Sequence, residues 1–340
     1  MIRTAIWRMP KWKRLKTIEK SKNYKNDMFQ NINITKTFSP KSSYISLIKK
    51  YINLPKESTP AEVPVYQKAN LKNTVSDKPT IIWFGHSSYI IYIQWKVILV
   101  DPVFSKNASP VSFIAKSFDW TNIYTVDDLP YIDILLITHD HYDHLDYETI
   151  KKIKSKVEIV VTGLWVGEHF EYWWYKADKI IELDRWNSID IWNFCITSTP
   201  ARHFSGRNLK RNTSLWSSFV LKTLDYQIYI WWDSGYDSHF KEIWNKFWSF
   251  DIAILECWQY NNMRSNIHMM PEEVVQAWID LNAKLILPVH RGKFNLSMHP
   301  RNEPIKRFVS QANKLWVSYT TPMISESIVI WENIPQNTRR

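Results

Sequence analysis

A short run of metal-type ligands directly after an apolar segment most restricts how this 340-residue chain can fold. Within six residues, the segment DILLITHDHYDHLD contains four such ligands, His139, His141, Asp143 and His144. Side chains alternate along an extended backbone, so His139 and His141 point to one side and can reach one ion. Asp143 and His144 follow where the chain must bend into a helix near Tyr147, so they can face a second ion. The segment predicts a metal centre at the end of a buried strand.

Three further apolar runs of strand length end on the same types of residue. FCITSTPARH ends at His203, QIYIWWD at Asp233 and KLILPVH at His290. Imidazole and carboxylate ligands without a thiolate suit Zn²⁺, with Fe or Mn as alternatives. Six ligands and a bridging carboxylate fit two ions with an open position for water. The alternatives are a structural zinc site, which would need four closed ligands and usually cysteines, and histidines that meet by coincidence.

The order of the segments predicts a layered α/β fold. Apolar runs alternate with helical stretches, such as one near residues 147–154 and one opening at Pro271, where proline followed by two acids is a helix-start signal. Residues 1–75 are polar and contain scattered prolines, so we expect an extended N-terminal segment packing on or preceding the core. Residues 76–335 would form the main domain.

Composition and charge restrict the class of protein. At 45% hydrophobic and 23% charged residues, the chain is typical of a soluble globular protein. The net charge of +11 favours anionic partners. We expect no transmembrane helix, because no apolar run reaches 18 residues, and no signal peptide, because the basic N-terminus lacks an apolar core. We therefore expect a cytoplasmic protein, with peripheral contact to an anionic membrane as an alternative. The sequence does not indicate the oligomeric state.

Several motifs resemble a known family. They are WFGHSSYIIYI, THDHYDHLD, TPARHFSGR, IHMMPEE, PVHRGKFNL and the early Phe29-Gln30-Asn31. Over about residues 20 to 330 the chain resembles the metallo-β-lactamase superfamily, in particular the branch of N-acylphosphatidylethanolamine-hydrolysing phospholipase D and its bacterial relatives. The resemblance implies an αββα sandwich, in which two mixed sheets are flanked by helices and a dinuclear zinc site lies along one edge.

The resemblance also implies how the ligands divide. One ion would be held by His139, His141 and His203, and the other by Asp143, His144 and His290, with Asp233 bridging the two. His268, in IHMMPEE, matches a family histidine near the metals and is a candidate for contact with a substrate oxygen. Its alternative role is helix capping or packing. Asp143 and Asp233 are candidate catalytic residues, because either carboxylate can orient the attacking water or accept its proton.

The implied function is a zinc-dependent hydrolase that uses a metal-bound hydroxide. We expect a phosphodiesterase of phospholipase D type, acting on N-acylphosphatidylethanolamine-like lipids. The alternatives are a hydrolase of a small soluble ester, lactone or cyclic phosphate, a metal-dependent nuclease, and a non-catalytic binding protein with a degraded site. Nucleic acid is the less favoured partner, because no insertion large enough for a nucleic-acid domain separates the ligands.

Glycine and tryptophan usage is abnormal. Average usage predicts about 24 glycines in a chain of this length, yet there are 6 Gly and 19 Trp. Relatives typically carry glycine at many of the tryptophan positions: Trp95, Trp165, Trp174, Trp192, Trp231, Trp232, Trp244, Trp248, Trp258, Trp278 and Trp316. They typically carry tryptophan at four arginine positions: Arg185, Arg264, Arg291 and Arg301.

One-directional exchanges of this kind predict a reassigned genetic code, with codons for glycine read as tryptophan and codons for tryptophan read as arginine. Genuine tryptophans would remain at sites such as Trp83, Trp173, Trp186 and Trp216. With the four arginines as tryptophans, the net charge becomes 11 − 4 = +7, which weakens the electrostatic argument for an anionic partner.

Overall fold

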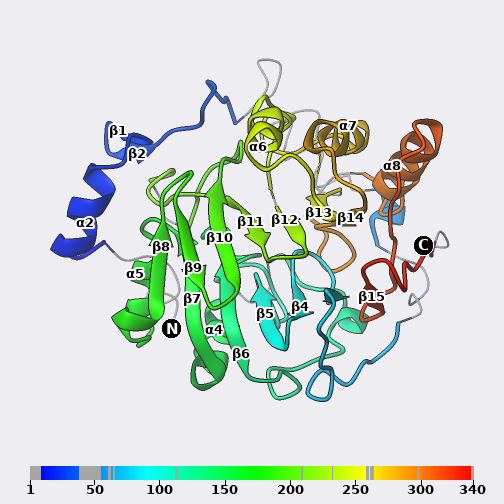
Figure 1. Ribbon diagram of the computed structural model, residues 1–340, viewed down its shortest axis with the longest axis horizontal. Helices are drawn as coiled ribbons and strands as arrows, with labels where there is room; N and C mark the ends of the chain where they lie inside the picture. The colour runs from blue at the N-terminus through cyan, green and yellow to red at the C-terminus, as the bar shows by residue number, and fades with distance from the viewer. Residues whose placement is uncertain are drawn as a thin grey trace.

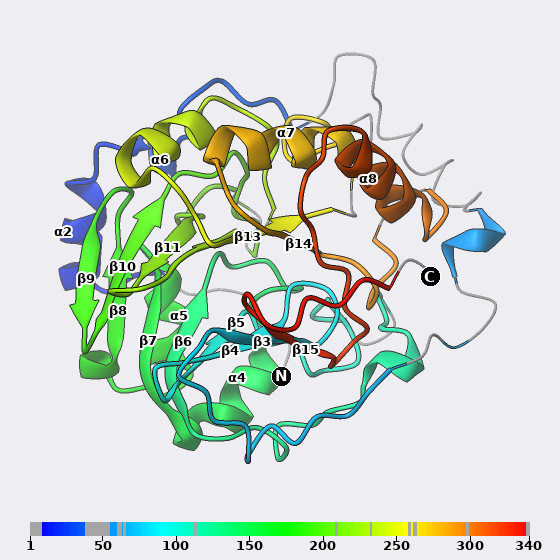
Figure 2. The same cartoon turned by 45° about the vertical axis from the view of Figure 1, so that its right-hand side comes forward.

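Two β-sheets packed face to face, with helices on both outer faces, form the protein (Figure 1). The computed structural model describes residues 9–37, 55–59, 63, 66–111, 114–207, 210–231, 233–257, 260, 264–296 and 299–337. Figure 2 shows the four layers, with α6, α7 and α8 above one sheet and α4 below the other. The predicted αββα sandwich is therefore confirmed.

The seven-stranded sheet has the order β15-β3-β4-β5-β6-β7-β8. Its first four strands pair antiparallel, and β5 to β8 pair parallel. The strands are β3 (Thr80–Trp83), β4 (Tyr89–Ile93), β5 (Lys96–Val100), β6 (Ile132–Ile137), β7 (Val157–Gly163), β8 (Ile180–Leu183) and β15 (Ser327–Val329). The run 81–93, which reads as one strand-like segment, is in fact β3 and β4 joined by a turn.

The six-stranded sheet has the order β14-β13-β12-β11-β10-β9. It is antiparallel from β9 to β12 and parallel from β12 to β14, so β10, β12, β13 and β14 all run in one direction. The strands are β9 (Ser188–Ile191), β10 (Phe194–Thr199), β11 (Ser218–Lys222), β12 (Gln227–Ile230), β13 (Ile252–Glu256) and β14 (Ile286–Val289).

Two of the helices that cover the sheets, α4 and α7, start where the sequence signals them. The α-helices beside the sheets are α4 (Tyr147–Ile153), α5 (Val166–Tyr172), α6 (His239–Phe247), α7 (Pro271–Leu281) and α8 (Glu303–Lys314). Short 3₁₀ turns are η1 (Lys56–Ser58), η2 (Asp119–Thr121), η3 (Lys154–Lys156) and η4 (Ala177–Lys179). Asp146 caps α4 by accepting from Glu148 N, and α7 begins at Pro271, as predicted.

Three apolar clusters hold the layers together. One lies between the sheets and is lined by aliphatic and aromatic residues of both, for example Ile98 and Leu136 from one sheet and Phe219 and Ile254 from the other. A second packs α6, α7 and α8 on the six-stranded sheet, and a third packs α4 and α5 on the other sheet. Burying such side chains on both faces leaves the strand ends as the place for polar function.

Part of the N-terminal stretch is an ordered arm. It consists of α2 (Trp12–Glu19) and a hairpin of β1 (Tyr24–Lys25) and β2 (Met28–Phe29). Figure 1 shows it in blue along the edge formed by β8 and α5. Within residues 1–75 the described structure is therefore a helix and a hairpin as well as extended chain; the domain boundaries stay a prediction. In the described part of the chain, no helix is both long and apolar enough to cross a bilayer.

Candidate metal centre

The candidate ligands meet at one edge of the sandwich. His139, His141, Asp143 and His144 lie in the loop that follows β6 of the seven-stranded sheet. His203, Asp233 and His290 follow β10, β12 and β14 of the other sheet, whose carboxyl ends lie at the same edge because these strands run in one direction. The two sheets therefore each supply part of one cluster.

The first group is formed by His139, His141, His203 and Asp233, which could hold a metal ion. His139 Nε2 lies 2.9 Å from His141 Nδ1, and His203 Nε2 lies 3.3 Å from the same atom. Gly206 permits the close approach of the neighbouring loop, since a Cβ there would lie 2.8 Å from His141 Nε2. The structure thus brings together the three histidines that the family resemblance assigns to one ion.

The second group contains Asp143, His144 and His290, together with His86. Asp233 lies between the two groups. Its Oδ2 is 3.3 Å from His144 Nε2 and 3.6 Å from His203 Nε2, and its Oδ1 is 3.0 Å from His290 Nε2. A carboxylate in this position can reach an ion on either side, which is the geometry a bridging ligand requires.

Burial keeps most of these imidazoles neutral, which is the form that binds a metal. Burial lowers the pKa of His139, His203 and His290 well below the ordinary value. It lowers the pKa of His141 to about 3. Burial also lowers the pKa of His144, but the neighbouring Asp233 and Asp143 carboxylates outweigh it and raise that pKa well above the ordinary value. The carboxylates thus favour positive charge at this point, which a divalent ion would supply.

Three of the imidazoles have a hydrogen-bond partner for the nitrogen that faces away from the centre. His144 Nδ1 lies 2.8 Å from Asp101 Oδ2, and Asp101 also accepts from Thr138 N at 2.9 Å. His203 Nδ1 lies 2.9 Å from Ile267 O. His290 Nδ1 lies 2.7 Å from Ser87 Oγ. Partners of this kind fix the tautomer and ring orientation of metal-binding histidines.

His268 lies beside both groups, just before α7. Its ring centroid is 5.2 Å from that of His203 and 5.9 Å from that of His290. Its Nδ1 is 2.9 Å from Glu256 Oε2, and Glu256 Oε1 accepts from Met269 N at 2.8 Å. His268 is thus oriented by a buried carboxylate at the end of β13, with Nε2 left for another contact.

Sequence reasoning did not single out three residues of this region: His86, Asp101 and Glu256. His86 Nε2 lies 3.1 Å from Asp143 Oδ2. Glu256 ends an apolar strand and Asp101 directly follows one, which is the signal that identified the other candidates, whereas His86 lies three residues after β3; each of the three stands alone rather than in a dense motif. His86 was further hidden because β3 and β4 read as a single run.

The backbone near the second group is strained. His86, Asp101 and His290 have φ values of 52°, 39° and 59°, in the left-handed region that residues other than glycine rarely adopt. Hydrogen bonds hold the first and last together, His290 N donating to His86 O at 2.9 Å and His86 N donating to Arg291 O at 2.6 Å. Strain of this kind concentrates at functional sites, where the surroundings enforce it.

Comparison with known proteins agrees with this arrangement. Residues 96–291 match the beta-lactamase superfamily domain. An uncharacterized protein of Mycobacterium tuberculosis is 32% identical over 91% of this chain and 85% of its own length. The N-acyl-phosphatidylethanolamine-hydrolyzing phospholipase D 1 of Caenorhabditis elegans is 26% identical over 74% of each chain. Igni18, a metallo hydrolase of Ignicoccus hospitalis, has a similar fold, with a TM-score of 0.57 and 14% identity over 74% of this chain and 97% of its own.

The chain belongs to the metallo-β-lactamase superfamily. Within it, the protein is a metal-dependent hydrolase.

Asp101 provides a test of the contacts behind the ligands. Asp101→Ala removes the acceptor that orients His144, so we expect zinc affinity to fall by about 10- to 100-fold, measured by competition with a chromogenic chelator. The matched control is Asp133→Asn in β6, since Asp133 instead accepts from Lys96 Nζ at 2.8 Å. Equal zinc affinity of Asp101→Ala and wild type would contradict the assigned role.

Proposed function

We propose that this protein is a dinuclear zinc phosphodiesterase of phospholipase D type that acts on N-acylphosphatidylethanolamine-like lipids. The observation that carries the proposal is the convergence of five imidazoles, four of them kept neutral by burial, and two carboxylates on one buried point. These side chains come from both sheets. The similarity to the C. elegans phospholipase supports the choice of substrate.

The proposed ligands follow the division described above. His139, His141 and His203 would hold one ion. Asp143, His144 and His290 would hold the other, with Asp233 between them. The donor set fits zinc, because it offers nitrogen and oxygen without sulfur, and iron or manganese remain the alternatives. When bound, such ions supply Lewis acidity and lower the pKa of a coordinated water.

The residues of the chain have separate tasks in this proposal. Asp143 or Asp233 orients the attacking water and accepts its proton. The water oxygen bonds to phosphorus while the bond from phosphorus to the ethanolamine oxygen breaks, so the products are phosphatidic acid and an N-acylethanolamine that leaves with a proton. His268, oriented by Glu256, contacts a substrate oxygen through Nε2.

The activity test uses purified protein loaded with two equivalents of zinc. We expect it to release phosphatidic acid from N-acylphosphatidylethanolamine, measured by mass spectrometry of the lipid products. His141→Ala should abolish the release, because it removes a ligand that the other groups cannot replace. His239→Gln is the control, since His239 is also a buried histidine but begins α6 and belongs to neither ligand group.

Other results would point to other functions. A zinc-loaded protein that cleaves only a small soluble ester, lactone or cyclic phosphate would contradict the lipid substrate. Cleavage of RNA or DNA would favour the nuclease alternative. No hydrolysis of any of these substrates by the loaded protein would favour a binding role.

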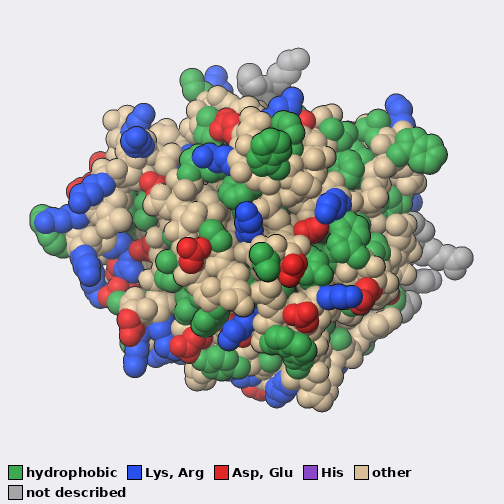
Figure 3. Space-filling view, in the orientation of Figure 1, with side chains coloured by type: hydrophobic (Ala, Val, Ile, Leu, Met, Phe, Trp, Pro, Cys, Tyr) green, Lys and Arg blue, Asp and Glu red, His purple; other side chains and the backbone are tan. Residues whose placement is uncertain are grey.

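We further propose that α2 carries the contact with anionic membranes. Trp12 is 72% exposed and Met9 is 57% exposed, and exposed lysines, among them Lys13 and Lys16, surround them. Figure 3 shows basic side chains gathered at the left edge of the molecule, where α2 lies in Figure 1. Exposed aromatic and basic side chains together favour the interface of an anionic bilayer.

Vesicle sedimentation tests this contact. We expect Trp12→Ala to bind phosphatidylglycerol-containing vesicles more weakly than wild type, with little binding of either to phosphatidylcholine alone. Leu224→Ala is the control, because Leu224 is 93% exposed in the turn between β11 and β12. Equal binding by Trp12→Ala and wild type would exclude α2 as the contact.

A further inference from the structure

The N-terminal arm is anchored firmly to the core. Arg14 of α2 pairs with Glu168 at 3.0 Å and with Glu171 at 2.9 Å, and also contacts Glu182. Phe29 of β2 is fully buried, and its N–H donates to Asn212 O at 2.8 Å. The chain that follows Phe29 is thereby delivered to the segment between β10 and β11, which carries His203.

Asn31 uses its side chain to hold the backbone of His203. Its Nδ2 donates to His203 O at 2.8 Å, and its Oδ1 accepts from His203 N at 3.1 Å. The same Oδ1 accepts from Trp216 Nε1 at 3.2 Å, which keeps the carboxamide in place. One side chain thus satisfies both backbone polar groups of a candidate ligand 172 residues away.

His203 needs such support because no regular element holds it. It lies between Thr199, where β10 ends, and Ser218, where β11 begins, and the described part of this segment contains neither strand nor helix. The imidazole ring of His203 is held by a different segment, through the contact of Nδ1 with Ile267 O at 2.9 Å. Backbone and ring are therefore held by two separate segments.

We propose that Asn31 is a positioning residue for His203, through which docking of the N-terminal arm completes the ion site formed by His139, His141 and His203. The proposal rests on the metal centre of the proposed function. It gives a role to the Phe29-Gln30-Asn31 motif: Phe29 anchors the arm and Asn31 holds the ligand.

Stepwise metal titration tests this role. We expect Asn31→Ala to bind one of two ions about 10- to 100-fold more weakly, as for other contacts behind metal ligands, with the second ion unchanged. Co²⁺ titration followed by visible absorption measures both steps. Asn31→Asp keeps the size and the acceptor but loses the donor to His203 O, so we expect the same site to weaken. The control is Asn33→Ala, because the exposed Asn33 of the same arm donates to Asp237 at 2.7 Å and not to a candidate ligand.

The titration distinguishes failure of the proposed role of Asn31 from failure of the proposed hydrolase function. If wild type binds two ions and both Asn31 variants bind them equally well, Asn31 has no positioning role, and the proposed hydrolase stands. If both ions weaken equally in the variants, or if Asn33→Ala has the same effect, the arm stabilises the fold in general and the proposal is wrong. If wild type binds no divalent ion, the proposed function itself fails.

A separate observation concerns the backbone at the tryptophans. In the described residues, eight tryptophans have positive φ, between 53° and 75°: Trp95, Trp165, Trp174, Trp186, Trp192, Trp248, Trp316 and Trp331. Only glycine adopts this conformation without steric cost, and the penalty for a bulky residue is about 1–2 kcal/mol. Trp95 shows the reason most directly. With Gln94, it forms a two-residue turn between the paired Ile93 and Lys96, where both φ values are positive and glycine is the preferred residue.

These φ values sharpen the set of glycine-like positions. Trp186 was expected to be a genuine tryptophan, but its φ of 67° makes it a glycine-like position. Trp331, with a φ of 68°, is a glycine-like position as well. Trp231, Trp244 and Trp278 have no positive φ. Trp231 is fully buried against Phe240, at 5.2 Å between ring centroids, so its indole points into the apolar cluster. Trp232 and Trp258 lie outside the described residues.

The arginines show the complementary pattern. Arg185 and Arg301 are 6% and 7% exposed, and neither forms an ion pair with a carboxylate in the described part of the chain. Burial lowers the pKa of each to about 10. Arg185 lies over Trp216 at 5.5 Å and Arg301 over Trp120 at 4.8 Å. Burying a charged guanidinium beside an aromatic ring is costly, whereas an indole would fit such a site without that cost.

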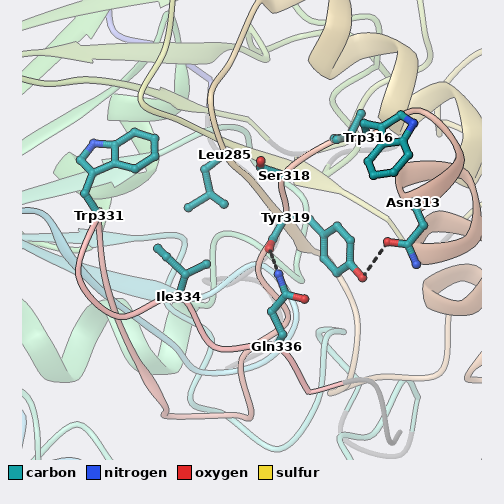
Figure 4. Close-up of a pocket in the computed structure, with 9 residues that line it drawn as sticks. Leu285, Asn313, Trp316, Ser318, Tyr319, Trp331, Ile334 and Gln336 are labelled. Atoms are coloured by element: carbon teal, nitrogen blue, oxygen red, sulfur yellow. Dashed lines mark hydrogen bonds between the residues drawn. The ribbon is translucent and has the colours of Figure 1, made fainter.

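We infer that the codons at these positive-φ positions specify glycine in the living cell, and that the codons of Arg185 and Arg301 specify tryptophan. One surface pocket illustrates the consequence. Its volume is about 660 Å³, and Trp316 and Trp331 stand on opposite sides of it (Figure 4). With glycine at both positions these walls disappear, so the pocket indicates no ligand.

Peptide mass spectrometry of the protein from its native cells tests this inference. We expect glycine masses at positions 95, 165 and 248 and tryptophan at 185 and 301. A recombinant chain carrying the eight Trp→Gly changes should unfold at a higher temperature than the printed sequence, whereas Trp83→Gly, in the core, should lower the transition. Tryptophan found in the native peptides, or UGG codons beneath them, would overturn the inference.

Discussion

The structure depends on the meeting of two sheets at one polar edge. An apolar cluster fills the space between the sheets, so the histidines and carboxylates gather where the strands end. Asp233 stands at the centre of this edge, within 3.0–3.7 Å of imidazole nitrogens on both sides. Burying so many polar ligand atoms away from water costs free energy, and the atoms repel one another, unless a cation binds between them. A cation bound at this edge would therefore stabilise the fold.

Much of this could be predicted from the sequence, because the signals were local. His139, His141, Asp143 and His144 form one dense motif after an apolar run. His203, Asp233 and His290 each end such a run, and parallel strand directions bring the ends together. Recognition of the family motifs then supplied the division into two groups and the four layers, which periodicity alone does not give. The substrate could not be predicted in the same way, since the loops that select it carry no local signal.

The parts that could not be predicted depend on distant contacts or on backbone conformation. His86 was hidden in a turn inside an apparent single strand. Glu256 looks like an ordinary strand end until His268 is seen beside it. Trp186 follows Asp184 and Arg185 in a sequence context that suits a core aromatic residue, and only its φ of 67° reveals a glycine-like position. Torsion angles carry information about residue identity that composition does not.

The hold on His203 has a consequence for how the protein is made. Its backbone is fixed by Asn31 and its ring by Ile267, so the loop becomes rigid only after chain segments on both sides in sequence have docked. Contacts of such long separation form late in folding. The nascent chain therefore presents the dense histidine motif well before the site is complete, and early capture of an ion there would be incomplete and weak. The candidate centre therefore cannot be complete until His290, its last ligand in the sequence, has been synthesised.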